Sequence, residues 1–260
     1  MTLTLGQLNE ICDDKSRQSR RQAYLYRVQH DGARYGMDAP AVLAQVTAQV
    51  LHESGAMRYT QEVWGPTRAQ RGYQGTLGNT QPGDGRRFSG HGLLQLTGRA
   101  NHRAYTRWVR ENYGGDADFE AHPQLVRDPA WLGLEVVYFF AVTPGLLDYA
   151  RAGNIEMVTR RVNGGLNGYH DRLAWYDRTA LVVLGHKRDD VSGFQEAAGI
   201  KVDGISGPQT RAAMHEALSG GAVARVAPAA PAAHEVPPVP RAAPLQAIFA
   251  ALAAIFRRRK

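Results

Sequence analysis

Two glutamates, Glu53 and Glu62, are the residues of this 260-residue chain whose type and spacing suggest chemistry. Glu53 follows Val46 by seven residues and Val50 by three, which places it on the apolar face of an expected helix. Burial and the negative end of that helix would both raise the pKa of its carboxyl, as a general acid requires. The alternative is an ordinary glutamate at the end of a helix.

Glu62 follows Glu53 by nine residues, and one unbroken helix would put the two on opposite faces. Gly55 lies between them and can turn the chain so that the carboxyls converge. Two carboxyls that face each other across a cleft can hydrolyse a glycosidic bond, because one protonates the leaving oxygen and the other activates water. The alternative for Glu62 is a surface glutamate.

The elements that must position these residues are mostly helices, and strand-like alternation is sparse. We therefore expect a mainly α fold, either all-α or with a small β element. Asp38 should cap the third helix, with Pro40 in its first turn, and Asn154 should cap the sixth. The expected helices cover residues 5–13, 16–29, 38–54, 98–113, 130–141, 155–162 and 169–185.

The segment 65–92 contains eight glycines and two prolines, so it cannot be a regular helix. A long irregular stretch inside a compact domain is usually functional or disordered. Because Trp64, Tyr73 and Phe88 accompany these glycines, we expect an ordered wall of a site.

Amide and hydroxyl side chains follow this segment at Gln95, Thr97 and Asn101, and another amide stands at Asn163. Such groups suit neutral sugars, since they pair with hydroxyl and N-acetyl groups as both donors and acceptors. The alternatives are that Thr97 caps a helix and that Asn163 only begins a turn.

The C-terminal third divides by composition into three parts. Residues 187–218 predict a small module of two short helices around a Gly-Pro turn, after a main domain at 1–186. Residues 219–244 are a linker rich in Ala and Pro, which should be extended. Residues 245–260 place apolar side chains on one helical stripe that ends in Arg-Arg-Arg-Lys.

The net charge of +7 resides mainly in this tail, where six basic residues and one acidic residue follow Ser219. A nearly neutral body disfavours a nucleic-acid-binding protein. The tail stripe is too short to span a bilayer but could lie in a membrane interface. We expect it to engage anionic lipid or lipopolysaccharide; the alternative is a helix docked on the body.

In the range 38–185 the chain resembles glycoside hydrolase family nineteen, which includes chitinases and many phage endolysins. The resemblance implies a lysozyme-like helical fold with a cleft and an inverting, single-displacement hydrolysis. The matching pieces are His52-Glu53-Ser54-Gly55, Gln61-Glu62, residues 88–101, residues 122–131, Arg161 to Gly168 and Asp171-Arg172-Leu173.

The same resemblance implies roles for individual residues. Glu53 matches the general acid and Glu62 the general base, while Thr97 matches a hydroxyl that helps to hold the water. The remaining matches are sugar contacts at Gln95, Asn101 and Asn163, a cleft arginine at Arg172, and a further water-positioning hydroxyl at Thr67.

The chain departs from the family pattern at several positions. His91 stands between two glycines where the family usually has arginine, which predicts a pH dependence near neutrality because histidine titrates near pH 6.5. Ala56 replaces a second glycine after the acid. Residues 63–67 replace the usual Asn-Tyr-Ser after the base.

Residues 191–218 resemble a shortened peptidoglycan-binding module, carried by Phe194-Gln195 and the run 202–211. We therefore expect a monomeric endolysin that hydrolyses the β-1,4 glycan of peptidoglycan. The alternatives are a chitinase, a lytic transglycosylase that uses one glutamate, and a wall-binding protein without activity.

No cofactor is expected. Metal catalysis is disfavoured because no second histidine follows His52 at the spacing of a zinc-binding helix. Cys12 is the single cysteine, so an intrachain disulfide is impossible. The first residues do not resemble a signal peptide, which predicts that the protein waits in the host cytoplasm until a holin releases it to the periplasm.

Overall fold

The computed structural model describes residues 2–220, and the expectations for the linker beyond Gly220 and for the tail lie outside this range. The described chain is mainly helical, as predicted, and its β structure is limited to the isolated bridges Gln61–His91 and His91–Leu96. The α-helices are α1 Leu5–Cys12, α2 Gln18–Tyr26, α3 Pro40–Glu53, α4 Arg68–Arg71, α5 Asp84–Arg87, α6 Arg99–Tyr113, α7 Leu134–Val142, α8 Leu146–Arg151, α9 Ile155–Asn163, α10 Tyr169–Val183, α11 Val191–Ala197 and α12 Pro208–Leu218.

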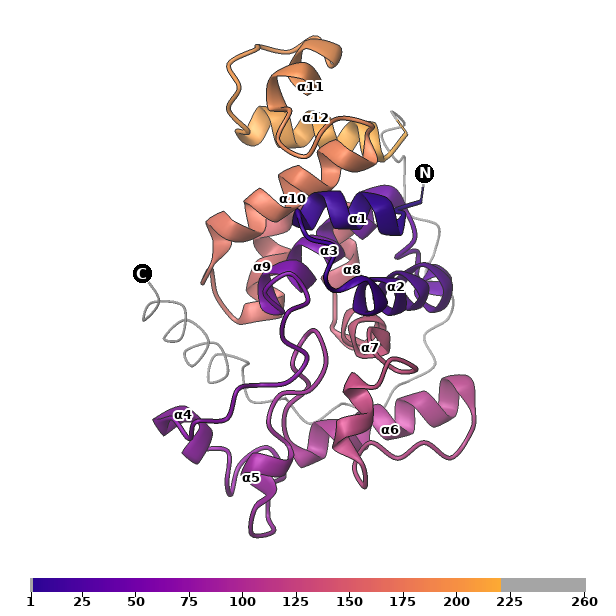
Figure 1. The fold of residues 1–260 in the computed structure, drawn as a ribbon, viewed down its shortest axis with the longest axis vertical. Helices are drawn as coiled ribbons and strands as arrows, with labels where there is room; N and C mark the ends of the chain where they lie inside the picture. The colour runs from indigo at the N-terminus through magenta and orange to yellow at the C-terminus, as the bar shows by residue number, and fades with distance from the viewer. Residues whose placement is uncertain (1, 221–260) are drawn as a thin grey trace.

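Helix α3 is the central element of the body, which comprises α1–α3 and α7–α10 (Figure 1). Every residue from Ala41 to Leu51 is buried, so the helix is covered on all sides. Its neighbours include α10, α8 and α9. Because α3 ends at Glu53, the apolar packing of this helix fixes the position of the expected acid.

The start of α3 differs from the prediction. Pro40 occupies the first turn as expected, but the residue at the cap is Ala39, and no side chain caps the helix. A residue before proline is driven out of the helical region, and Ala39 has φ −59° and ψ 130°. Asp38 is thus one residue too far from the helix, and its predicted capping role is wrong.

Helix α7 begins at Leu134, four residues later than predicted. Trp131 N donates to the carbonyl of Asp128 (2.9 Å) in a turn that precedes the helix. Gly133 then takes φ 92°, a conformation that favours glycine, at the N-cap of α7. By contrast, Asn154 caps α9 as predicted, accepting a hydrogen bond from Met157 N (3.0 Å).

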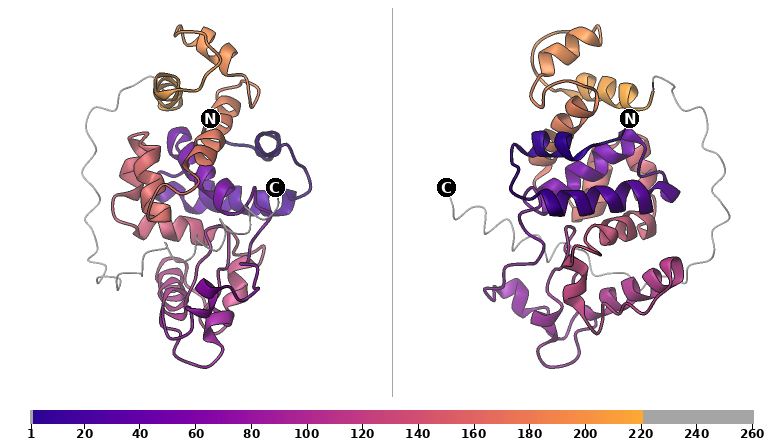
Figure 2. Two further views of the ribbon diagram at one scale, coloured as in Figure 1. Left: turned by 90° about the vertical axis from the view of Figure 1, so that its left-hand side faces the viewer. Right: turned by 45° about the vertical axis from the view of Figure 1, so that its right-hand side comes forward.

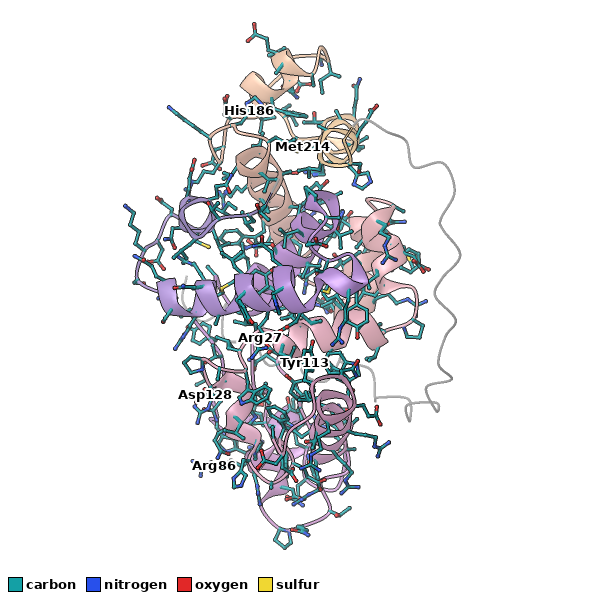
Figure 3. The ribbon with its side chains drawn as sticks, turned by 90° about the vertical axis from the view of Figure 1, so that its right-hand side faces the viewer. Arg27, Arg86, Tyr113, Asp128, His186 and Met214 are labelled. Carbon is teal, nitrogen blue, oxygen red and sulfur yellow. The ribbon has the colours of Figure 1, made fainter. Side chains whose placement is uncertain are left out.

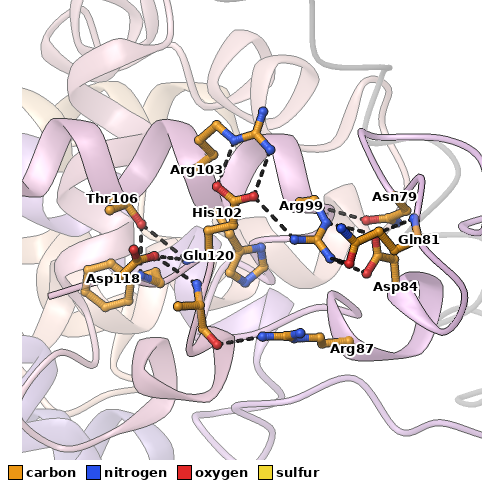
Figure 4. Close-up of polar contacts among 12 residues, drawn as sticks. Asn79, Gln81, Asp84, Arg87, Arg99, His102, Arg103, Thr106, Asp118 and Glu120 are labelled. Carbon is orange, nitrogen blue, oxygen red and sulfur yellow. Dashed lines mark hydrogen bonds and ion pairs between the residues drawn. The ribbon is translucent and has the colours of Figure 1, made fainter.

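Residues 60–127 form a lower lobe that holds α4, α5, α6 and the 3₁₀ turn Pro123–Arg127 (Figures 1 and 2). The segment 65–92 is largely irregular, as predicted, but contains the short helices α4 and α5. Within this lobe an ion network ties α6 to α5 and to Glu120 (Figure 4). Arg99 binds Asp84 (2.8 Å from Nε), and Arg103 binds Glu120 (2.7 Å from Nε).

The C-terminal module consists of α11 and α12 around the turn at 202–208, as predicted, and it lies at the opposite end from the lower lobe (Figure 1). Arg211 of α12 forms a bidentate ion pair with Asp177 of α10, at 2.9 and 3.0 Å. Met214, labelled in Figure 3, is fully buried. The module therefore packs on the body. Among residues 2–220, no helix has the length and apolarity to cross a bilayer.

Candidate active site

Glu53 is the last residue of α3, and its carboxyl is almost completely buried. Arg172 of α10, itself fully buried, donates Nη2 to Glu53 Oε1. Burial raises the pKa of Glu53, although the charges of Arg172 and His52 pull it down. The sequence-based expectation of a buried carboxyl with a raised pKa is confirmed.

Arg172 does not depend on Glu53 alone. Its Nη1 donates to the side-chain carbonyl of Gln49, and its Nε donates to the backbone carbonyl of Asn167 (3.3 Å). Gln49 lies one turn before Glu53 on α3. The arginine can therefore keep its place whether the Glu53 carboxyl is protonated or not.

A second pairing lies beside the first. His52 Nδ1 and Asp171 Oδ2 are 2.6 Å apart, and Trp175 Nε1 donates to the same oxygen (3.0 Å). The His52 ring lies so close to Gly168 that a side chain there would collide with it. Consecutive residues of α3 thus bind consecutive residues of α10, which holds the end of α3 in a fixed rotation.

Asn163, the last residue of α9, is buried at 1 % exposure. Its Nδ2 donates to the Asn167 carbonyl (3.2 Å), the same carbonyl that Arg172 contacts. The structure therefore places Asn163 at the end of α9, where it binds the loop that supports Arg172. The sugar contact implied by the resemblance stays a prediction.

The chain reverses directly after Glu53, as the position of Gly55 predicted. Gly55, Ala56 and Met57 have φ of 58°, 57° and 64°, a left-handed turn that is costly for residues other than glycine. Arg20 of α2 donates Nη1 to the carbonyls of Met57 (3.0 Å) and Arg58 (2.6 Å). This clamp directs the chain towards the lower lobe and Glu62.

Glu62 is 5 % exposed and accepts three hydrogen bonds. Gln70 Nε2 (3.0 Å) and Tyr73 Oη (3.2 Å) donate to Oε1, and Gly90 N (3.1 Å) donates to Oε2. Burial and the nearby Glu62 raise the pKa of Tyr73, so the phenol keeps the proton that it donates. The donors to the Glu62 carboxyl are thus all neutral, whereas the donor to Glu53 is the charged Arg172.

The hydrogen bonds of Gln70 and Tyr73 to Glu62 were not predicted, although Tyr73 was expected in the wall of the site. Thr67, expected to position water, is the N-cap of α4, and its role towards water stays a prediction. Its Oγ1 accepts from Gln70 N (3.2 Å), and Gln70 Oε1 accepts from Thr67 N (2.9 Å). A capping box of this kind fixes the first turn of a helix. Thr67 therefore reaches Glu62 through Gln70.

His91 corrects a second expectation. Its ring is buried and stands edge-on to His102 at 5.4 Å between ring centroids. Burial lowers the pKa of His91 to about 4. The imidazole is thus neutral near pH 7, and the predicted pH dependence near neutrality from His91 is wrong.

Gln95, Thr97 and Asn101 form a chain of side-chain hydrogen bonds to the backbone. Gln95 Nε2 donates to Gly92 O (2.7 Å), Thr97 Oγ1 to Gln95 O (2.8 Å) and Asn101 Nδ2 to Thr97 O (2.7 Å). Gln95 has φ 54°, and its buried Oε1 finds no partner among residues 2–220. A strained residue with an unpaired polar atom is typical of a functional site.

Glu135, also missed by the sequence analysis, anchors this loop to α7. Its Oε1 accepts from Leu93 N (2.6 Å) and its Oε2 from Gly133 N (2.8 Å). Burial raises the pKa of Glu135 to about 7. Glu135 lies 42 positions from Leu93 and outside the other motifs, so no local pattern indicated this role.

A pocket of about 470 Å³ opens beside Glu62. Its lining residues are Gln61, Glu62, Trp64, Gly83, Arg86, Arg87 and Ser89.

Within residues 2–220, Glu53 and Glu62 make no hydrogen bond with each other, and each has its own partners. No three acidic, histidine or cysteine side chains of that range gather as a metal ion would need.

The helical body, the lower lobe and two buried carboxyls in unlike surroundings define the class of fold: it is the chitinase-type, lysozyme-like fold. The structure resembles chitinase C from Streptomyces griseus HUT6037 with a TM-score of 0.51, at 18 % identity over 71 % of this chain and 78 % of that one. A bacterial family 19 chitinase matches with a TM-score of 0.50, at 18 % identity over 72 % and 97 % of the two chains.

A comparison with the sequences of known proteins also finds a relative described as a glycosyl hydrolase. A "Glycosyl hydrolase family 19 domain-containing protein" of Haemophilus influenzae (strain ATCC 51907 / DSM 11121 / KW20 / Rd) is 34 % identical over 117 residues. The match covers 44 % of this chain and 52 % of the relative, so the chain spans about half of that protein's length. No family model matches the chain.

Proposed function

We propose that the chain is a family 19 glycoside hydrolase that cleaves β-1,4 bonds between N-acetylated amino sugars by inversion. The observation that carries this proposal is the contrast between the two carboxyls. Glu53 is buried, has a raised pKa and is paired with Arg172, whereas Glu62 accepts from three neutral donors at the edge of a pocket. Inverting glycosidases need such a division between acid and base.

The reaction follows from this arrangement. The protonated Glu53 carboxyl gives its proton to the leaving oxygen, and Arg172 stabilises the carboxylate that forms. Glu62 removes a proton from the water that attacks the opposite face of the sugar. Thr97 and Gln95, which lie on the strained loop near Glu62, would orient the water and the sugar.

The substrate that we propose is peptidoglycan, and the biological role is host lysis as an endolysin. The support is the module at 191–218, which resembles a wall-binding unit and packs on α10. We propose further that the protein stays in the host cytoplasm until a holin releases it, and that the tail at 245–260 engages anionic lipid. Chitin is the alternative substrate, favoured by the chitinases that share the fold.

Mass spectrometry of soluble fragments from purified peptidoglycan tests the proposal, with wild type compared with Glu53→Gln. We expect reducing N-acetylmuramic acid ends from wild type and a loss of about 10³-fold in the variant, within the range for a lost general acid. The amide retains an oxygen for Arg172, so the fold should survive, as circular dichroism will show.

Each other outcome points elsewhere. Reducing N-acetylglucosamine ends would keep the two-carboxylate mechanism and change the bond. Anhydro ends would replace hydrolysis by transglycosylation and remove Glu62 from the mechanism. No fragments from peptidoglycan, but cleavage of chitin oligomers, would make the protein a chitinase. Binding to the cell wall without release of any fragments would indicate a wall-binding protein without activity.

A further inference from the structure

The pocket beside Glu62 has one basic wall. Arg86 and Arg87 of α5 line it, and both side chains are exposed. Arg87 is partly engaged, since its Nη2 donates to Ala121 O (2.6 Å). The Arg86 side chain makes no hydrogen bond or ion pair with any residue in the range 2–220. Figure 3 shows Arg86 in the lower lobe.

The acidic groups near this wall are already committed. Asp84, on the same helix, is buried and binds Arg99 through both oxygens (2.8 and 2.5 Å). Glu62 is the single carboxyl among the lining residues, and three donors occupy it. The pocket thus contains two cations and one engaged anion, a surplus of positive charge next to the expected base.

The basic wall is also held firmly. Gly85 N donates to Gln74 Oε1 (3.2 Å), and a side chain at Gly85 would meet the backbone of Gln74. Because Asp84 is bonded to Arg99 and Gly85 packs on the backbone of Gln74, the backbone leading into Arg86 is fixed. Only the guanidinium remains to be placed, and a ligand can place it.

The other lining residues indicate what kind of ligand fits. Trp64 offers an aromatic surface of the sort that packs against a sugar ring. Gln61 binds Arg127 through its Oε1 (2.6 Å) and keeps its amide nitrogen for a sugar hydroxyl. The guanidinium of Arg86 is suited to a carboxylate, which it can bind through two parallel hydrogen bonds.

We propose that Arg86, assisted by Arg87, forms an anionic subsite that binds a carboxylate carried by a muramoyl residue of the glycan. This inference rests on the proposed glycosidase function and adds a residue that would distinguish peptidoglycan from chitin. Chitin has no carboxylate, whereas a muramoyl residue carries one on its free lactyl group or on its attached peptide. The subsite therefore favours peptidoglycan over chitin.

The test is binding of defined tetrasaccharides to the Glu53→Gln protein, with and without Arg86→Gln, by calorimetry. The probes are chitotetraose, the alternating N-acetylglucosamine–N-acetylmuramic acid tetrasaccharide, and the same tetrasaccharide with a dipeptide on each lactyl group. We expect Arg86→Gln to raise Kd about fivefold for an acidic probe and to leave chitotetraose unchanged. The effect should shrink as salt is added.

The two acidic probes identify the source of the carboxylate. An effect on the free lactyl form alone assigns the lactyl group, and an effect on the dipeptide form assigns the peptide. Arg68→Gln is the matched control, because Arg68 is an exposed arginine of α4 that does not line the pocket. Arg86→Lys should retain part of the affinity.

Equal weakening for all three probes, or no weakening for any, would overturn the subsite. Thermal melting of each variant shows whether a loss of folding explains a loss of binding. The test is separate from that of the proposed function: if wild type releases no fragments from peptidoglycan, the hydrolase proposal fails, but the binding data still decide whether Arg86 prefers a carboxylate.

Discussion

Arg172 meets the Glu53 carboxyl in a place that solvent does not reach, with side-chain exposures of 0 % and 2 %. A buried ion pair is costly to break, because the remaining charge stays buried without its partner. The pair therefore does two things: it stabilises the contact between α3 and α10, and it sets the protonation of the expected acid.

Removing Arg172 should destabilise the protein strongly. We expect Arg172→Met to lower the free energy of unfolding by about 1–3 kcal/mol, because the buried Glu53 carboxyl and the Gln49 side chain lose their hydrogen-bond donor. Because Glu53 and Arg172 share one contact, the losses of Arg172→Met and Glu53→Gln should not add in the double variant. Urea unfolding of the four proteins measures the coupling. Strictly additive losses would show that the pair is not energetically coupled.

His91 gives a prediction for acid stability. Its pKa falls from 6.5 in the unfolded chain to about 4 in the folded protein, and that of the adjacent buried His102 falls to about 3. Between the unfolded and the folded pKa of each histidine, the unfolded chain binds more protons than the folded protein. The contribution of the two neutral histidines to stability is therefore complete above pH 6.5 and is lost as pH falls towards 4 and below.

Glu135 opposes this trend, because its pKa is raised to about 7 and it binds its proton more tightly in the folded state. The comparison must therefore isolate His91. His91→Phe keeps an aromatic ring beside His102 and should flatten the decline in melting temperature between pH 6.5 and 4. A variant that declines as steeply as wild type would contradict the assignment.

Ala56 offers a test of the left-handed turn. Its φ of 57° costs an alanine about 1–2 kcal/mol, whereas glycine adopts it freely. After the entropy that glycine adds to the unfolded chain, about 0.5–1 kcal/mol, Ala56→Gly should stabilise the protein by about 0.5–1 kcal/mol. Ala23→Gly in the middle of α2 should instead destabilise it by about 1 kcal/mol. Thermal unfolding distinguishes the two signs.

Thr67 should act as a cap. Thr67→Ser keeps the hydroxyl and should match wild type in stability and activity. Thr67→Ala should cost about 1 kcal/mol through loss of the cap. If capping positions Gln70, then Thr67→Ala and Gln70→Ala should both lower kcat more than they change KM. Should Thr67→Ser lose as much activity as Thr67→Ala, a direct role for the threonine would be indicated.

The local parts of the fold were predictable from the sequence. The spacing of Val46, Val50 and Glu53 placed the carboxyl on the buried face of α3, and Asn154 identified the start of α9. Both signals lie within a few residues of the element concerned. Asp38 misled because proline at position 40 excludes the preceding residue from the helix, and this constraint outweighed the capping preference.

Contacts between distant segments were not predictable in the same way. Gln70 and Tyr73 bind Glu62 only because residues 65–92 fold back on the base, and Glu135 reaches Leu93 across 42 positions. The predicted titration of His91 near neutrality is wrong because the burial of its ring depends on distant segments that local sequence does not reveal. Only the resemblance connected Arg172 with Glu53, which lies 119 positions away.

The left-handed turn after Glu53 divides the control of the two carboxyls between separate parts of the molecule. The hydrogen-bond partner Arg172 of Glu53 belongs to the body, while Gln70, which binds Glu62, belongs to the lower lobe. The hydrogen-bond partners of each carboxyl are therefore local to its own part of the molecule. The position of one carboxyl relative to the other depends instead on the turn at residues 55–57, so substitutions there can move the two groups apart while each keeps its own hydrogen-bond partners.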